Sequence, residues 1–122
     1  MKMLLDTHIL LWHLADNPKL SQTHSQLIED RQHQKFFSIA SLWEIAIKSS
    51  LGKLHLQCPI EIIVPREITI LDIKLHHVKL VQAFPFHHRD PFDRLLIAQA
   101  IFEQLTIMTD DEWFGNYEVK LI

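Results

Sequence analysis

Four acidic residues of this 122-residue chain stand where their carboxylates could act together. Asp6 follows the first apolar run and Asp111 the last, while Glu44 and Asp93 lie in helix-like segments. If the strands run parallel, their carboxyl ends share one sheet edge, where all four residues could converge. Two like charges 4 Å apart at an effective dielectric near 20 repel by ~4 kcal/mol, so convergence requires protonation or a divalent cation. Oxygen ligands favour Mg²⁺ or Mn²⁺ over zinc, and such a site supports phosphodiester hydrolysis.

Each acidic residue also has a structural interpretation as a helix cap. Asp6 could cap the helix that follows it, and Asp111 the turn that follows the last strand. The segment Ser41-Leu-Trp-Glu44 has the form of a capping box, and Asp90-Pro-Phe-Asp93 approximates one. Each of these residues, considered alone, can therefore be interpreted either as a helix cap or as part of a metal site.

Two of these acidic residues share a helical face with apolar residues, which predicts that their side chains point into the protein rather than into solvent. Asp93 shares a helical face with Ile97 and Ala100. Glu44 shares one with Ile47 and Leu51. Because a capping carboxylate is expected to be solvated, faces that pack inward favour chemistry over capping.

The apolar periodicity predicts alternating strands and helices along one domain, residues 1–122. Strands are expected at 3–5, 35–39, 67–72 and 106–109, with a further edge strand at 117–121. Helices are expected at 9–13, 21–32, 40–51, 74–83 and from Asp90–Pro91 onward, and 59–65 is either a short helix or an irregular connection. This order predicts an α/β fold whose parallel sheet carries helices on both faces.

The composition narrows the class of protein. An apolar content of 48% fits a folded globular domain, and no apolar run approaches the ~20 residues that span a bilayer. The lone Cys58 excludes an intrachain disulfide and suggests a reducing, cytoplasmic location. The net charge of −3 does not indicate nucleic-acid binding by itself. Nine histidines show no zinc-ligand spacing and are expected mostly at the surface.

Four segments give the sequence a specific resemblance. It is similar to PIN-domain ribonucleases of the VapC toxin type over essentially its whole length, through LLDTHILLW (4–12), SIASLWEIAIKSSLGKL (38–54), HHRDPFDRLLIAQA (87–100) and IMTDDEWFGNY (107–117). The resemblance implies a three-layer α/β/α fold with a central parallel sheet of four to five strands. It also implies divalent-metal endoribonuclease activity with Mg²⁺ or Mn²⁺, an RNA substrate and a cognate antitoxin. We further expect a homodimer.

Matched motif by motif, the acidic residues of that family fall on Asp6, Glu44, Asp93 and Asp111. Asp110 also follows Thr109, but the family spacing T-x-D-x-x-F selects Asp111. Asp90 is assigned to the helix cap.

Three further side chains are candidates for contact with substrate. Thr7 could hydrogen-bond a metal-bound water or a phosphate, or could bond backbone in a turn. Arg89 lies in a polar loop expected at the rim of the site, where it could contact a phosphate. Arg94 could orient a carboxylate or contact a phosphate, although a surface position in the first helical turn is the commoner case. Lys48 is expected to pair with Glu44 one helical turn away.

The aromatic side chains could be taken for base-stacking platforms. Trp12, Trp43 and Phe36–Phe37 lie at helix or strand spacing on apolar faces. Core packing is therefore the favoured interpretation for all of them.

Two other function classes compete with the nuclease. A Mg-dependent phosphoacceptor or phosphatase domain would want two acidic residues after the first strand, where this chain has Asp6 followed by Thr7-His8; Asp72 and Thr109 keep it open. A non-catalytic binding module of the same fold would be expected to lose acidic positions, whereas this chain keeps all four. Detection of an aspartyl-phosphate or of metal-dependent RNA cleavage separates the three.

Overall fold

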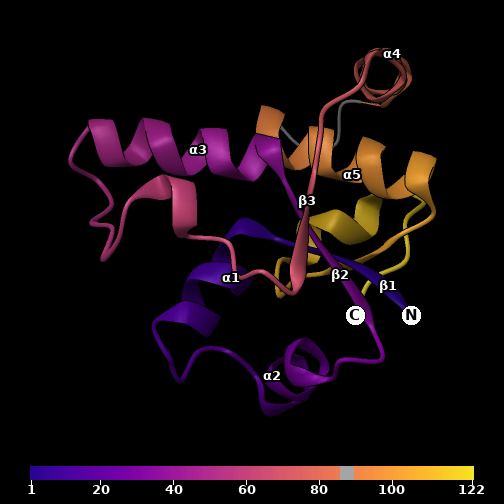
Figure 1. Cartoon of the computed structure of the whole chain (residues 1–122). Coiled ribbons are helices and arrows are strands. Elements are labelled where there is room, and N and C mark those ends of the chain that lie inside the picture. The colour runs from indigo at the N-terminus through magenta and orange to yellow at the C-terminus, as the bar shows by residue number, and fades with distance from the viewer. Residues whose placement is uncertain (86–89) are drawn as a thin grey trace.

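Four parallel strands form the central sheet in the computed structural model, which describes residues 1–85 and 90–122 (Figure 1). In the order of the sheet they are β3 (Ile68–Leu71), β2 (Gln34–Ser38), β1 (Lys2–Leu5) and β4 (Thr106–Met108). Each neighbouring pair is parallel, so the carboxyl ends of all four strands lie at one edge. The predicted parallel α/β fold is confirmed.

Helices cover both faces of this sheet. They are α1 (Thr7–Leu14), α2 (Gln22–Glu29), α3 (Ile39–Ser50), α4 (Leu75–Ala83) and α5 (Pro91–Glu103), with two 3-10 turns, η1 (Ile60–Ile62) and η2 (Glu112–Asn116). Figure 1 shows α2 and α5 on opposite sides of the strands. The strand β1 divides the core accordingly: Met3 and Leu5 pack with α1 and α2, and Leu4 packs with α5. Alternation along β1 therefore places hydrophobic side chains into both layers.

The predicted edge strand at 117–121 is reduced to a single bridge. Ile107 pairs with Leu121 in parallel orientation. The Ile107 N–H donates to the Lys120 oxygen, and the Ile122 N–H donates to the Ile107 oxygen, each at 2.9 Å. The chain end thus protects the open edge of β4 without forming a full strand.

The sequence prediction for α3 was wrong in two respects. Its N-cap is Ser38, whose hydroxyl accepts from the backbone of Ala40, so the supposed capping box at Ser41 does not exist. The apolar stripe that contains Trp43 and Leu51 faces outward, and these side chains are 57% and 63% exposed. The other aromatic residues divide: Phe37 is fully buried, whereas Trp12 and Phe36 are partly buried and pack against the core.

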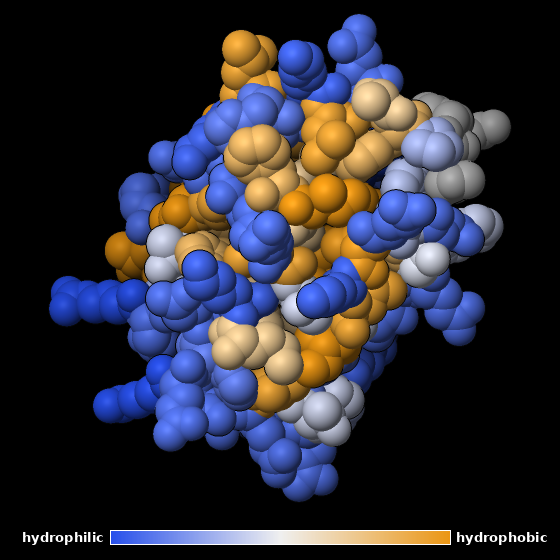
Figure 2. All heavy atoms as spheres, turned by 90° about the vertical axis from the view of Figure 1, so that its right-hand side faces the viewer, coloured by the Kyte–Doolittle hydropathy of each residue, from blue (hydrophilic) through white to orange (hydrophobic). Residues whose placement is uncertain are grey.

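Helix α4 lies outside α5 and packs on it through aromatic rings. The His76 ring stacks on Phe102 with centroids 3.9 Å apart, and His77 is fully buried beside it. The expectation of surface histidines is therefore wrong for His77. Figure 2 views the molecule from the right-hand side of Figure 1 and shows hydrophobic residues gathered between hydrophilic ones on this face. Leu75 and Val78 remain exposed on α4.

Candidate active site

Asp6 stands at the junction of β1 and α1, and both of its carboxylate oxygens are held. Its backbone N–H donates to the Met108 oxygen at 3.0 Å, which continues the pairing of β1 with β4. Its Oδ1 accepts from the Thr7 N–H at 2.7 Å, and its Oδ2 accepts from the Thr109 hydroxyl at 2.9 Å. The side chain caps α1 as expected, yet Asp6 is only 4% exposed. Burial raises the pKa of Asp6, and the two hydrogen bonds oppose that rise.

Glu44 is buried on the inner side of α3, although the stripe that was expected to share its face is exposed. The Thr7 hydroxyl donates to Glu44 Oε1 at 2.8 Å and also lies 2.8 Å from Ser41 Oγ. Because one hydroxyl carries one proton, Thr7 accepts from Ser41 when it donates to Glu44. Lys48 Nζ pairs with Glu44 Oε2 at 2.9 Å, as predicted, and this contact raises the pKa of Lys48. Thr7 thus bonds a side chain rather than the backbone.

Asp93 lies in the first turn of α5, and the residues just before it fix where this helix begins. Asp90 caps this helix by accepting from the N–H groups of Phe92 and Asp93, and Pro91 occupies the first turn, both as predicted. Burial, followed by the charges of Asp90, Asp6, Glu44 and Asp111, raises the pKa of Asp93 to about 8. Because electrostatic interactions weaken with distance, a carboxyl group whose pKa is affected by all of these charges lies near them.

Asp111 follows β4 and has a capping role as well. Its Oδ1 accepts from the Trp113 N–H at 3.0 Å at the start of η2, and its own N–H donates to the Thr109 hydroxyl at 3.0 Å. Asp111 is partly buried, whereas Asp110 is exposed. The structure therefore brings Asp111, rather than Asp110, toward the other acidic residues.

The four predicted acidic residues lie at the carboxyl edge of the sheet, after β1, in α3, in α5 and after β4, and the charges of Asp6, Glu44 and Asp111 all act on Asp93. We call them the acidic cluster: Asp6, Glu44, Asp93 and Asp111. Their donors are all carboxylate oxygens, which suits a hard divalent cation such as Mg²⁺ or Mn²⁺. Burial raises the pKa of Asp93 most, and the negative charges of Asp90, Asp6, Glu44 and Asp111 raise it further, as is common for carboxylates grouped at a functional site.

Thr109 is a further residue of the candidate site. Its hydroxyl links Asp6 to the Asp111 backbone, so it positions two acidic residues at once. The sequence pointed to Thr109 through the T-x-D pattern after the last strand and as part of the phosphoacceptor alternative, neither of which predicts this positioning role.

Of the two arginines proposed to contact substrate, only Arg94 belongs to the part of the chain that the structure describes. Arg94 is buried rather than on the surface, and its guanidinium donates to the backbone oxygens of Val81 and Pro85. These contacts tie α5 to the end of α4. Arg89 lies outside the described residues.

A second group of potential ligands lies apart from the acidic cluster, between α4 and α5. His76, His77 and Glu103 present ligand atoms within 4.8 Å of one another. However, His77 Nδ1 accepts from the Lys74 N–H at 3.0 Å, so its Nε2 carries the proton and donates to Glu103 Oε1 at 3.2 Å. The nitrogen that a metal would need is occupied, and burial lowers the pKa of His77. This group fits a structural hydrogen bond better than a metal site.

Comparisons with known proteins identify the family and agree with the fold. The family model described as "PIN domain" matches residues 3–120. Among solved structures, the chain resembles VapBC2 from Rickettsia felis bound to a promoter DNA fragment, with a TM-score of 0.76, 16% identity, and coverage of 100% of this chain and 98% of that one. It also resembles DNA-bound VapBC from Salmonella typhimurium, with a TM-score of 0.71, 15% identity, and coverage of 100% and 97%. VapBC-1 from nontypeable Haemophilus influenzae follows with a TM-score of 0.63, 19% identity, and coverage of 100% and 97%.

At these identities the solved structures support the fold alone. A comparison with curated proteins finds no significant match. None of the helices within residues 1–85 and 90–122 is long and apolar enough to cross a membrane.

Proposed function

The chain belongs to the PIN domain family, and on this premise we propose that it is a divalent-metal-dependent endoribonuclease that serves as the toxin of a toxin–antitoxin pair. PIN domains are typically nucleases and generally use divalent metals. The observation that carries the proposal is the placement of Asp93 in the first turn of α5, at the sheet edge where Asp6, Glu44 and Asp111 also lie; burial and the charges of these residues and of Asp90 raise its pKa to about 8. Such a cluster is stable in its charged form only with a cation among the carboxylates.

The residues of the cluster have different parts in this proposal. Asp6, Asp93 and Asp111 would hold Mg²⁺ or Mn²⁺, with Glu44 as a further acidic ligand. When bound, the metal supplies a water of lowered pKa and neutralises charge that develops on the phosphate. Because burial and the neighbouring charges raise the pKa of Asp93 to about 8, binding of a metal by its carboxylate would compete with binding of a proton.

The neutral side chains hold the carboxylates in place before substrate arrives. Thr7 N–H and the Thr109 hydroxyl fix the two oxygens of Asp6, which leaves the remaining lone pairs for a cation. Lys48 and the Thr7 hydroxyl fix Glu44 in the same way. Such outer contacts orient metal ligands and commonly affect affinity and activity. The predicted contacts of Thr7, Arg89 and Arg94 with RNA remain proposals.

We propose two protein partners. The solved structures that this chain resembles include VapBC2 from Rickettsia felis, FitAB bound to a DNA fragment and a toxin–antitoxin complex from Klebsiella pneumoniae. A cognate antitoxin could neutralise this chain by placing an Arg or Lys near Asp6 and Asp93, where the surplus negative charge lies. The second partner is another copy of the chain. The exposed apolar stripe of α3, made of Ile39, Trp43, Ile47 and Leu51 at one-turn spacing, suits a symmetric helix contact.

The direct test is cleavage of RNA by the purified protein. We expect Mg²⁺ or Mn²⁺ to support cleavage, EDTA to abolish it, and re-added Mn²⁺ to restore it. Sequencing the new 5′ ends would then identify the RNA and the cleavage site. Cleavage that survives complete chelation would contradict the metal-dependent mechanism.

A further inference from the structure

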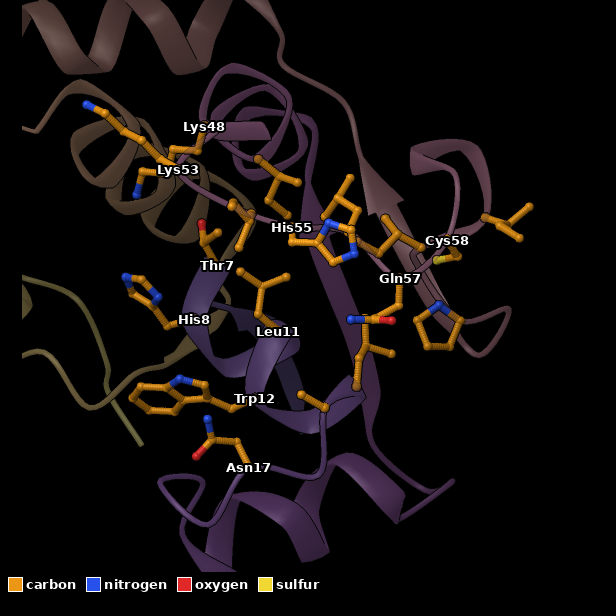
Figure 3. Close-up of a pocket in the computed structure, with 18 residues that line it drawn as sticks. Thr7, His8, Leu11, Trp12, Asn17, Lys48, Lys53, His55, Gln57 and Cys58 are labelled. Atoms are coloured by element: carbon orange, nitrogen blue, oxygen red, sulfur yellow. The ribbon is translucent and has the colours of Figure 1, made fainter. Parts of the chain in front are cut away.

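A pocket of about 780 Å³ lies beside the acidic cluster, between α1, the end of α3 and the segment 53–65. Figure 3 shows its lining side chains, among them Thr7, His8 and Trp12 from α1, Lys48 from α3 and Lys53 from the segment after α3. This size lies within the range of small-ligand sites. We call it the α1 pocket.

The α1 pocket is continuous with the candidate active site. Thr7 and Lys48 line the pocket, and both of them also bond Glu44, at 2.8 and 2.9 Å. A substrate whose reacting phosphate lies at the acidic cluster would therefore extend into this pocket with its next residue.

The charged side chains that line the α1 pocket are basic, whereas those of the acidic cluster are carboxylates. Two lysines and two imidazoles, Lys48, Lys53, His8 and His55, belong to its described lining, together with the thiol of Cys58. No carboxylate belongs to that lining. Most of the remaining wall is apolar, with Leu11, Ile45 and Ile63 among its members. A ligand suited to both would combine negative charge with a flat, apolar body.

Two aromatic rings on α1 offer a surface for such a body. His8 and Trp12 are stacked with centroids 5.9 Å apart and an interplanar angle of 27°. Trp12 is partly buried against the core and also lines the pocket, while His8 is exposed. Rings placed in this way can stack on nucleobases of any sequence, because every base has an aromatic face.

We propose that the α1 pocket binds a base of single-stranded RNA next to the scissile phosphate, with His8 and Trp12 against the base and Lys53 on an adjoining phosphate. This inference rests on the proposed ribonuclease function. An amphipathic peptide could also use an apolar pocket. The basic lining favours RNA, because a peptide that brings an Arg or Lys to the acidic cluster would meet like charge at Lys48 and Lys53, whereas an RNA phosphate would be attracted by both.

The experiment first maps cleavage by the unmutated protein and then measures binding in an Asp6→Asn background. Short RNAs around the mapped site carry 2-aminopurine at one position at a time, because its fluorescence falls on stacking. We expect strong quenching at one position beside the cleaved bond. His8→Ala should restore that fluorescence and weaken binding roughly 10-fold. Trp12→Leu should also restore it, after circular dichroism confirms its fold.

The contribution of Lys53 to RNA binding is measured from the dependence of the RNA affinity on salt concentration. Lys53→Ala should reduce the slope of log affinity against log salt by roughly 0.7, as for one lost phosphate contact on a single strand. Lys79→Ala, a matched loss of an exposed lysine on α4 outside the pocket lining, should leave slope and fluorescence unchanged.

The outcomes separate this inference from the function on which it rests. Metal-dependent cleavage with no quenched position, or with His8→Ala and Lys53→Ala binding RNA like the parent, would overturn the pocket while leaving the ribonuclease intact. Absence of any cleavage by the unmutated protein would overturn both. If these variants keep RNA binding but lose the cognate antitoxin, the pocket is a protein site and the inference is wrong.

Discussion

The Thr109 hydroxyl donates a 2.9 Å hydrogen bond to Oδ2 of Asp6, a residue 103 positions earlier in the chain. The same oxygen of Thr109 accepts from the Asp111 N–H. One side chain after β4 therefore fixes an acidic residue after β1 and the backbone of another. This pairing follows from the parallel register of β1 and β4, in which Leu5 lies opposite Met108.

Replacing Thr109 tests this link. Thr109→Val leaves a buried oxygen of Asp6 without its donor, which should cost about 1–3 kcal/mol of stability. It should also raise the pKa of Asp6 further, because the lost bond lowers it, and should reduce RNA cleavage by roughly 10-fold or more. Thr109→Ser keeps the hydroxyl and should behave like the parent. Equal melting temperatures and rates for the valine and serine variants would contradict the role of the bond.

The pKa of Asp93 predicts how stability depends on pH without metal. In the folded chain the pKa is raised from 3.8 to about 8, so between these values the folded state holds a proton that the unfolded state releases. The contribution of Asp93 to stability therefore falls as pH rises through this window. Asp93→Asn should remove that decline and stabilise the metal-free protein at pH 8 by about 1 kcal/mol. This corresponds to a rise of roughly 4 °C in melting temperature.

Asp72→Asn is the matched control, because Asp72 is exposed after β3. Thermal unfolding in EDTA from pH 5 to 8 measures both variants. A parent and an Asp93→Asn protein with parallel pH profiles would show that Asp93 titrates normally.

Metal binding should offset the loss of folding stability that repulsion among the carboxylates of the acidic cluster causes. Mn²⁺ at 100 times its dissociation constant should stabilise the unmutated protein by about 2.7 kcal/mol through mass action. The shift should grow as pH approaches 8, because Asp93 must lose its proton to bind the metal. Asp93→Asn should show a much smaller shift. Equal Mn²⁺-induced shifts in the two proteins would count against Asp93 as a ligand.

The exposed stripe of α3 predicts the oligomeric state. Trp43 is 57% exposed and meets Phe92 of α5 edge-on, with ring centroids 5.2 Å apart. Light scattering should show a dimer for the parent and a monomer for Trp43→Asp, because burial of a charge in an apolar contact is unfavourable. Leu75→Asp makes the same kind of change on α4, where Leu75 is 83% exposed, and should remain dimeric. A monomeric parent would remove the dimer proposal.

Much of the fold was predictable because its signals are local. Short apolar runs ended by polar residues located the strands, and Asp90–Pro91 marked the start of α5 correctly. The convergence of the acidic residues followed from one assumption, that the strands are parallel, and the resemblance then selected the same residues.

The errors lie where tertiary packing decides. The apolar spacing of α3 could not show which of its faces meets the core, so Trp43 was expected inside and is exposed. Arg94 was expected at the surface, but the end of α4 buries it against two backbone oxygens. Thr109 owes its importance to a bond across 103 positions, which no local pattern contains.

The proposed function requires that the acidic cluster hydrolyse RNA with a bound metal. The most direct test compares RNA cleavage in Mn²⁺ by the parent, Asp6→Asn and the control Asp72→Asn, with equal folding checked by circular dichroism. We expect Asp72→Asn to cleave like the parent and Asp6→Asn to lose about 100-fold or more of the rate, since removing a charged ligand weakens both metal binding and its chemistry. Cleavage by folded Asp6→Asn at the rate of the parent would contradict the account.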